Sequence, residues 1–329
     1  MSDSTMKLAN YQLIEVQKEV YKLPKGVDLI GASKLWEQGE KGRGVTIAVI
    51  DTGCDTEHIE LKDRIIGGRN FTEEDEGNAN IYKDYNGHGT HVCGTIAASM
   101  NGTGVVGVAP EASLIILKAS NKKGIARYSS IINAIYYSIK IKVDIISLSL
   151  GGEADNEMLH EAIREAIRHN ILVVCAAANE NADGLSMISY PADYDECISV
   201  GSIDYEELNK QMKRERHLDL VAPGVSILST YLDGTYAEMS GTSMAVPHVT
   251  GALALLMNYC KKEFGRKLTE SEMYAQLIKR TINFGYTPAE VGNGCIFLTA
   301  IDLVRDCYNQ TLNDIEKCKK DSFKSDKST

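Results

Sequence analysis

The chain has no run of apolar residues long enough to cross a membrane, and its first residues carry no secretion signal. The longest apolar stretch lies around residues 251–257, well short of the ~18–20 residues that a bilayer requires. Residues 1–20 lack an apolar centre between a basic start and a small-residue cleavage site. We therefore expect a cytoplasmic protein with no membrane partner.

Positive charge is also in short supply. Lys and Arg number 35 against 45 Asp and Glu, which gives a formal net charge of −10. An acidic total does not attract phosphates, so it argues against a nucleic-acid partner. With 43% hydrophobic and 24% charged residues in 329, the composition is that of a soluble globular protein with a large core.

Closely spaced cysteines are missing as well. The eight cysteines include no CxxC pair, and several, such as Cys175 and Cys197, lie in apolar runs. A free thiol in such a run behaves as a small hydrophobic side chain. We therefore expect reduced cysteines rather than a disulfide framework. The histidines form no HExxH zinc pattern.

Short β-branched runs alternate with longer amphipathic stretches from about residue 44 onward. Stretches such as 128–140 and 158–169 repeat apolar residues at helical spacing, which predicts helices. This alternation predicts an α/β fold with a mostly parallel central sheet and helices on both faces. The runs that predict buried strands are 45–50, 113–118, 143–148, 171–176 and 197–201.

Polar or glycine-rich residues follow several of these strands, at the edge where the carboxyl ends of parallel strands meet. Taken alone, Asp51 could be a turn residue, His88 a structural histidine and Ser243 a helix N-cap. Taken together they supply a carboxylate, a base and a nucleophile, in the chain order Asp, His, Ser. The segments are VIDTGCD at 49–55, NGHGTHVCGT at 86–95 and SGTSMAVPH at 240–248.

In order and spacing, these motifs resemble those of the subtilisin-like serine proteases over roughly residues 23–305. The segments DTGCD and KVDIISLSLGG are similar to the corresponding segments of bacterial intracellular subtilisins. The resemblance implies a three-layer subtilisin-like α/β fold and hydrolysis of peptide bonds. Further matching segments are GVAPEASL at 107–114, SLSLGG at 147–152, AAANE at 176–180, YPADY at 190–194 and LVAPGVSILST at 220–230.

The resemblance implies roles for four residues. Asp51 orients His88, which acts as general base and then as general acid, and Ser243 is the nucleophile that is acylated. Asn179 resembles the oxyanion-hole asparagine and acts with the backbone N–H of Ser243. The partners would be protein or peptide substrates.

The resemblance also implies the two edges of a substrate groove. A peptide would add between these edges as an extra strand, and glycines would let the backbones approach closely. One edge is formed by Gly124, Ile125 and Ala126, and the other by Ser149, Leu150, Gly151 and Gly152. Residues 207–217 are strongly charged where subtilisins carry a Phe-Ser-rich stretch, which leaves the specificity on the leaving-group side open.

Two other function classes share some of these sequence features. A non-catalytic subtilisin-like binding or sensor protein is the alternative, and the intact set of Asp51, His88, Asn179 and Ser243 argues against it. An esterase of the α/β-hydrolase type would need a GxSxG elbow and the order Ser, Asp, His, whereas Ser243 lies in GTSMA.

Calcium is the cofactor that the resemblance suggests. The loop 99–105 and a carboxylate would supply hard oxygen ligands, although Tyr21 stands where the family has a glutamine ligand. The alternative is a glycine-rich turn closed by its own hydrogen bonds. The residues of this site would be Glu60, Ser99, Asn101, Thr103 and Val105, and a second, weaker cation site would use the backbone of Ala192, Tyr194 and Cys197.

The two ends of the chain differ from its middle. We expect an N-terminal inhibitory extension over 1–20, a catalytic domain over 21–308 and a polar tail over 309–329 that frays. Leu13-Ile14-Glu15-Val16 resembles the inhibitory motif of intracellular subtilisins, with Glu15 in place of its proline. Leu13 and Ile14 would fill substrate pockets.

Two further expectations concern processing and assembly. The enzyme is expected to remove its own extension by a cut between Val16 and Leu23, and activity should rise when the extension leaves. Intracellular members of the family tend to be dimers, and the sequence leaves the choice between a monomer and a homodimer open.

Overall fold

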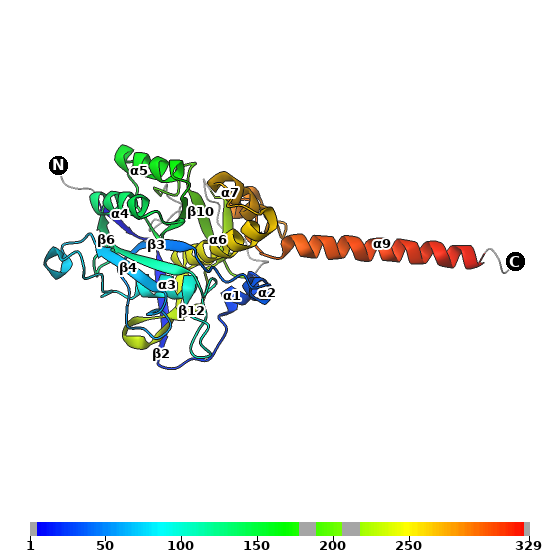
Figure 1. Ribbon diagram of the computed structural model, residues 1–329, viewed down its shortest axis with the longest axis horizontal. Coiled ribbons are helices and arrows are strands. Elements are labelled where there is room, and N and C mark those ends of the chain that lie inside the picture. Colours follow the sequence, from blue (N-terminus) through cyan, green and yellow to red (C-terminus); the bar gives the residue numbers. More distant parts are fainter. Residues whose placement is uncertain (1–4, 178–188, 206–217, 326–329) are drawn as a thin grey trace.

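A nine-stranded sheet runs through the centre of the computed structural model, which describes residues 5–177, 189–205 and 218–325 (Figure 1). The strand order is β14-β15-β11-β10-β9-β7-β3-β5-β4. The pairs from β4 to β15 are parallel, and β14 is antiparallel to β15. The strands are β3 (Thr46–Asp51), β4 (Ile65–Asn70), β5 (Ser113–Lys118), β7 (Ile145–Leu148), β9 (Leu172–Ala176), β10 (Ile198–Ile203), β11 (Leu220–Pro223), β14 (Thr281–Ile282) and β15 (Cys295–Ile296).

Side chains on β3 alternate between two hydrophobic cores. Ile47 and Val49 belong to one core, and Ala48 and Ile50 belong to the other. Because successive residues of a strand point to opposite faces, the sheet is buried on both sides. The first core is completed by α3 (His88–Ala97), α6 (Thr242–Phe264) and α7 (Glu270–Ile278), and the second by α4 (Tyr128–Ile141) and α5 (Glu157–Arg168). The predicted three-layer α/β fold, its five strands and its helices are confirmed.

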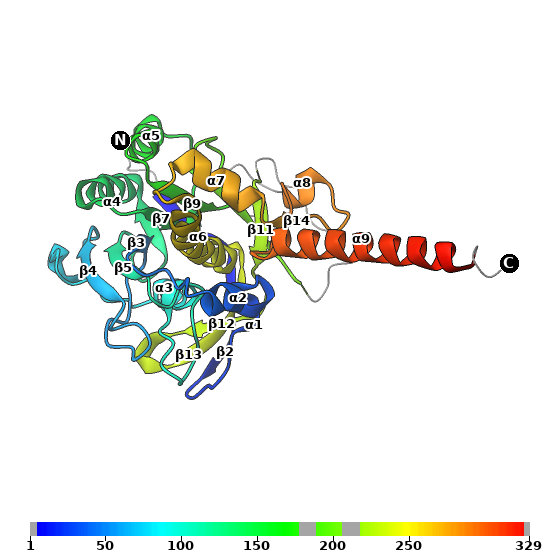
Figure 2. The ribbon, with the colours of Figure 1, turned by 45° about the vertical axis from the view of Figure 1, so that its right-hand side comes forward.

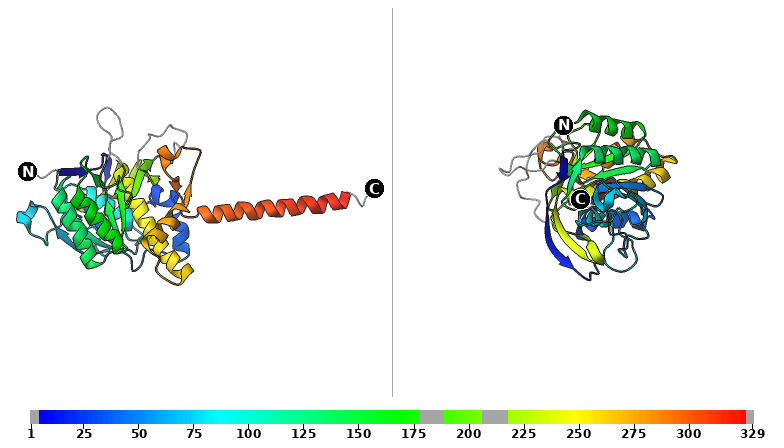
Figure 3. Two further views of the ribbon diagram at one scale, coloured as in Figure 1. Left: turned by 90° about the horizontal axis from the view of Figure 1, so that it is seen from above. Right: turned by 90° about the vertical axis from the view of Figure 1, so that its left-hand side faces the viewer.

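Two small antiparallel sheets lie beside this central structure, and the N-terminal extension supplies one strand to each. β1 (Thr5–Leu8) lies between β6 (Ile125–Arg127) and β8 (Leu150–Gly151). β2 (Tyr11–Gln17) pairs with β13 (Tyr236–Gly241), which also pairs with β12 (Ile227–Thr230). The right-hand view of Figure 3 shows the blue strand β2 alongside the yellow-green strand β13.

The C-terminal segment forms α9 (Ala300–Ser325), a helix that projects away from the rest of the molecule (Figures 1 and 3). The prediction that the tail frays from residue 309 is wrong for residues 309–325. The chain has no proline or glycine after Gly294, and apolar residues such as Tyr308, Leu312 and Ile315 continue at helical spacing. The remaining short helices are α1 (Lys25–Leu29), α2 (Ala32–Glu37), η1 (Glu74–Gly77), η2 (Leu232–Gly234) and α8 (Pro288–Val291).

The expected free cysteines agree with the structure at seven positions: Cys54, Cys93, Cys175, Cys197, Cys260, Cys295 and Cys307. No helix within the described ranges has both the length and the apolar character needed to cross a bilayer.

Candidate active site

Asp51 and His88 meet at the carboxyl end of the central sheet. Asp51 is the last residue of β3, and His88 is the first residue of α3. His88 Nδ1 and Asp51 Oδ1 are 2.8 Å apart, and both side chains are buried. The backbone N–H of Thr52 also donates to Asp51 Oδ1, at 2.7 Å. The carboxylate is therefore placed to hold the imidazole with its Nδ1 protonated.

The turn before His88 depends on Gly87. Its φ is +101°, a conformation that favours glycine, and a Cβ there would lie 2.1 Å from the ring of Tyr231. The sequence NGHG therefore places a glycine where the backbone turns sharply into α3.

Ser243 lies at the N-terminus of the long apolar helix α6 and is fully buried. Its Oγ is 3.2 Å from the carbonyl oxygen of Ser149 and 3.3 Å from that of Ala9. His88 Nε2 is buried and has no hydrogen-bond partner among the described residues. With the extension bound, the Ser243 hydroxyl thus contacts two carbonyls, and the free N–H groups at the start of α6 lie next to it.

The predicted substrate groove is occupied by β1 of the same chain. Met6 lies opposite Ala126, and Lys7 lies opposite both Ile125 and Gly151. The backbone N–H of Leu8 donates to Gly124 O at 3.0 Å, and that of Ala9 donates to Ser149 O at 3.2 Å. All seven predicted groove residues, at positions 124–126 and 149–152, are brought together around this strand.

Two glycines make room for the side chains of β1. A Cβ at Gly124 would lie 2.8 Å from Leu8 Cδ1, and one at Gly152 would lie 3.1 Å from Met6 Cγ. Met6 is fully buried and Leu8 is nearly so. The groove therefore takes apolar side chains at alternating positions of an added strand.

The prediction that Leu13 and Ile14 fill substrate pockets is wrong. They lie on β2, against β13, and are 43% and 47% exposed. Met6 and Leu8 are buried instead, because β1 has a strand on each side whereas β2 lies at an edge. The apolar–polar–apolar order of Met6, Lys7 and Leu8 is the sequence signal that could have identified the inserted strand.

Asp84 was not predicted as a site residue, yet its carboxylate joins the segments of Asp51 and His88. Oδ1 accepts the Thr52 hydroxyl at 2.9 Å and the N–H groups of Asn86 and Gly87. Oδ2 accepts both the N–H and the hydroxyl of Thr90, at 3.0 and 2.7 Å. An aspartate four residues before the histidine, followed by Asn-Gly, is typical of such a turn.

Tyr11 covers His88 from the side of the extension. The two ring centroids are 4.7 Å apart, and the Tyr11 hydroxyl donates to Asn86 Oδ1 at 3.2 Å. The same Asn86 oxygen accepts the backbone N–H of His88. Asn179 and the charged segment 207–217 lie outside the described residues.

Of the predicted calcium residues, Glu60 is fully buried, and the N–H of Ser99 donates to the Glu60 carbonyl at 2.9 Å. Tyr236 donates its hydroxyl to Glu60 Oε1 at 3.0 Å, whereas Oε2 is buried without a partner in the described part of the chain. Burial raises the pKa of Glu60 to about 7. Ser99 Oγ is likewise buried and unpartnered, and the Asn101 side-chain oxygen accepts the N–H and hydroxyl of Thr103. An unpaired buried carboxylate oxygen beside a loop of hard oxygens fits a divalent cation.

The loop is tied to the start of the catalytic domain. Tyr21 forms a parallel bridge with Gly104, and the Lys22 N–H donates to Gly104 O at 3.0 Å. The Tyr21 side chain is 78% exposed and contributes no amide oxygen to the site. Loop residues 99–106 and residues 21–23 together line a cavity of about 310 Å³.

The residues of the second, weaker cation site lie on one buried turn before β10. The carbonyl of Tyr194 accepts the N–H of Cys197 at 3.0 Å, and the Tyr194 ring stacks on His160. No three His, Cys, Asp or Glu side chains in the described ranges are grouped as a metal site would require. The second site stays a prediction.

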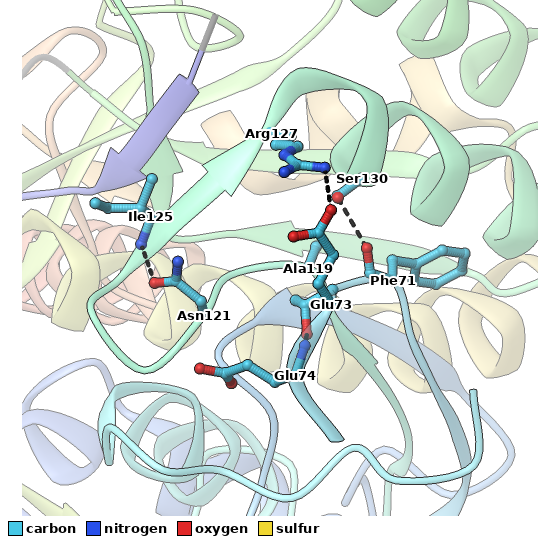
Figure 4. Close-up of a pocket in the computed structure, with 9 residues that line it drawn as sticks. Phe71, Glu73, Glu74, Ala119, Asn121, Ile125, Arg127 and Ser130 are labelled. Carbon is cyan, nitrogen blue, oxygen red and sulfur yellow. Dashed lines mark hydrogen bonds and ion pairs between the residues drawn. The ribbon is translucent and has the colours of Figure 1, made fainter. Parts of the chain in front are cut away.

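A separate cavity of about 290 Å³ lies beside β6 (Figure 4). Ile125 and Arg127 of β6 line it together with Glu73 and Glu74, and Arg127 forms a 2.7 Å ion pair with Glu73. Asp51, His88 and Ser243 do not line it. This cavity therefore borders the substrate groove but contains none of the candidate catalytic groups.

Sequence comparisons relate the chain to known proteins. Residues 42–294 match the subtilase family. The chain is 54% identical over 295 residues to an intracellular serine protease of Paenibacillus polymyxa, covering 89% of this chain and 90% of that protein. It is 49% identical over 311 residues to the major intracellular serine protease of Bacillus subtilis (strain 168), covering 93% and 97%. Subtilisin DY of Bacillus licheniformis is 42% identical over 238 residues, which is 72% of this chain and 85% of that protein.

Proposed function

Because the chain belongs to the subtilase family of serine proteases, we propose that it hydrolyses peptide bonds through an acyl-enzyme formed on Ser243. The protein is a serine endopeptidase, and its substrates are proteins or peptides. The observation that carries the proposed mechanism is the buried 2.8 Å contact of His88 Nδ1 with Asp51 Oδ1. Ser243 Oγ lies 3.3 Å from the carbonyl oxygen of Ala9, and Tyr11, two residues further along the same extension, packs against His88.

The proposed steps conserve protons. Ser243 Oγ attacks the scissile carbonyl carbon while its proton passes to His88 Nε2, and Asp51 stabilises the imidazolium through Nδ1–H. When the C–N bond breaks, His88 returns the proton to the leaving amine. A water molecule then attacks the acyl-enzyme by the same route and restores Ser243. Asn179 and the Ser243 N–H would hold the negative oxygen of each tetrahedral intermediate.

Substitution of the nucleophile tests this mechanism. Ser243→Ala should lose about 10⁶-fold in turnover and Asn179→Ala about 10²–10³-fold, both magnitudes being those known for subtilisin. Ser271→Ala, at an exposed position on α7, is the matched control and should keep full activity. A folded Ser243→Ala protein that still cleaves casein would overturn the proposal, and an unchanged Asn179→Ala would reduce Asn179 to a structural residue.

We also propose that the extension inhibits the enzyme until it is removed. β1 blocks the groove, Ala9 occupies the place of the scissile carbonyl, and Tyr11 covers His88. Lys18 and Glu19 form an exposed link, whereas Val20 is buried against the catalytic domain. This link lies within the predicted cutting region from Val16 to Leu23. The domain boundaries of the sequence analysis are kept in this proposal, and the tail over 309–329 includes the part of α9 from residue 309 to residue 325.

Calcium at the 99–105 loop is proposed as a structural ion. Glu60 and Asn101 would hold it with their side-chain oxygens, together with backbone oxygens of Ser99, Thr103 and Val105. It would neutralise the unpaired Glu60 oxygen and tie the loop to the body of the protein. It would take no part in the chemistry at Ser243.

Location and assembly are proposed from the relatives and from α9. The two relatives that match 89% and 93% of the chain are named intracellular serine proteases, which supports a cytoplasmic location. Val304, Tyr308, Leu312 and Ile315 share one face of α9 and are all exposed. An exposed apolar face on a projecting helix supports a homodimer in which a second copy covers it.

A further inference from the structure

One edge of β13 forms a surface that the proposed mechanism does not use. β12 pairs with the other edge, and β2 is the only described strand on this one. Figure 2 shows β2 alongside β13. When the extension leaves, β13 therefore keeps a row of backbone N–H and C=O groups without a strand partner.

β2 continues the path that the chain takes past Ser243. The Ala9 carbonyl lies at Ser243 Oγ, one residue follows, and Tyr11 then lies opposite Gly241. The chain runs on, antiparallel to β13, until Gln17 lies opposite Tyr236, and one extra residue, Ile14, is bulged between Leu13 and Glu15. A substrate with its scissile carbonyl in the place of Ala9 would direct its next residues along the same edge.

We infer that β13 binds the part of a polypeptide substrate that follows the scissile bond, from about its second to its eighth residue, as an added strand. This inference rests on the proposed function. Leu13, Ile14 and Val16 are 43–47% exposed, so the edge offers backbone pairing rather than deep side-chain pockets. The substrate class is an extended, unfolded polypeptide with a long segment after the cleaved bond.

One position on this edge selects for charge. Glu15, the sixth residue after Ala9, lies directly opposite the half-buried Glu238. Like charges opposite each other on two strands are destabilising, and opposite charges are stabilising. In a substrate that follows the same path, bulged at its fifth residue, a Lys or Arg as the sixth residue after the scissile bond would therefore bind better than the Glu15 of the extension.

Peptide substrates test separately how kcat/KM depends on the number of residues after the scissile bond and on the charge of the sixth of these residues. The self-processed enzyme is given peptides that are identical up to the scissile bond and continue for two, four, six or eight residues. We expect kcat/KM to rise about three- to tenfold from the shortest to the longest. At low salt, Lys as the sixth residue should exceed Glu by about three- to tenfold. Glu238→Lys should reverse this preference, and Glu263→Lys, at the exposed end of α6, should keep it.

Hydrogen exchange tests the predicted charge preference opposite Glu238 without any catalysis. In the full-length Ser243→Ala protein, Glu238→Lys should slow hydrogen exchange of the amides in residues 12–17, because Glu15 then faces a cation. Glu238→Gln should give an intermediate rate and shows whether the variants fold. Equal kcat/KM for all peptide lengths, or exchange and preference unchanged by Glu238→Lys, overturns the inference and leaves the proposed function standing. Failure to cleave any peptide overturns the proposed function itself.

Discussion

Asp84 has no proton to transfer in the proposed mechanism, yet both its oxygens hold the turn that presents His88 to Asp51. Asp84→Asn replaces one acceptor oxygen by an NH₂ group facing donors, which leaves buried groups unpaired. We expect a loss of about 1–3 kcal/mol in the free energy of unfolding and a lower kcat with little change in KM. Thermal melting and steady-state kinetics check this, with the exposed Asp63→Asn as the control. A variant with the parental kcat would show that Asp84 only stabilises the fold.

Individual residues were predictable from the sequence where a short motif fixed their surroundings. Asp51 ends a strand and His88 starts a helix, so their motifs place both at one edge of the sheet, where the structure brings them to 2.8 Å. Met6 was missed because its burial depends on β6 and β8, which lie more than a hundred residues away in the sequence. Local patterns carry no information on which distant edges receive a strand.

At the scale of elements, the position of β2 determines how the link to the catalytic domain can be cut. The exposed link follows Gln17, which lies opposite Tyr236, whereas Ser243 follows the other end of β13. Six residues of strand separate the two ends by about 20 Å. We therefore expect one molecule to cut the link of another, so that the half-time of processing falls as protein concentration rises. Intact-mass time courses at several concentrations measure this, with Ser243→Ala protein as a substrate that cannot cut itself.

The same time courses would also reveal cleavage of the link within a single molecule. A half-time that does not change with concentration, or a first cut after Ala9, would mean that the molecule processes itself. Ser243→Ala protein that loses its extension without added active enzyme would point to a contaminating protease.

The buried carboxylate of Glu60 should make stability depend on pH. The folded-state pKa of about 7 lies above the value of 4.5 for an ordinary glutamate, so the folded protein holds the proton more tightly. In EGTA, stability should therefore fall as the pH rises from about 5 to 8, by a few degrees in melting temperature. Calcium binds the deprotonated carboxylate, so its stabilising effect should grow over the same range.

Glu60→Gln is the control for this prediction. It removes the titrating group, so the difference in melting temperature between the parent and the variant should vary with pH in EGTA. If calcium raises the melting temperature of the variant as much as that of the parent, Glu60 is not a ligand. If EGTA leaves the parent unchanged at pH 8, the loop holds no calcium.

At the scale of the whole molecule, α9 is the part that the sequence described least well. Its many charges suggested a frayed tail, whereas its apolar residues recur every three or four positions and form a helical face. Val304 and Tyr308 are 71% and 65% exposed on that face. The central fold was predictable because the apolar residues of each strand and helix are buried within the same chain. The role of the apolar face of α9 depends instead on a partner that the sequence does not specify.

We expect the Ser243→Ala protein to sediment as a dimer and the added pair of substitutions Val304→Glu and Tyr308→Glu to make it a monomer. Acidic side chains on both copies would repel each other and would not be buried. Asp306→Ala, on the opposite face of α9, should remain dimeric. Sedimentation velocity over a range of concentrations distinguishes the two states, and a monomeric parent protein would exclude the dimer.

The covalent link at Lys18 and Glu19 determines how the extension competes with substrates. While the link is intact, β1 and β2 form a tethered ligand with an effective concentration in the millimolar range, as short flexible linkers provide. Substrates at micromolar concentration cannot displace it, even with equal intrinsic affinity. A single cut turns the same segment into a free peptide that dilution removes. A molecule that meets no active copy would therefore remain inhibited. A molecule that meets an active copy would have its link cut and become active, so that the active fraction of a population would grow autocatalytically.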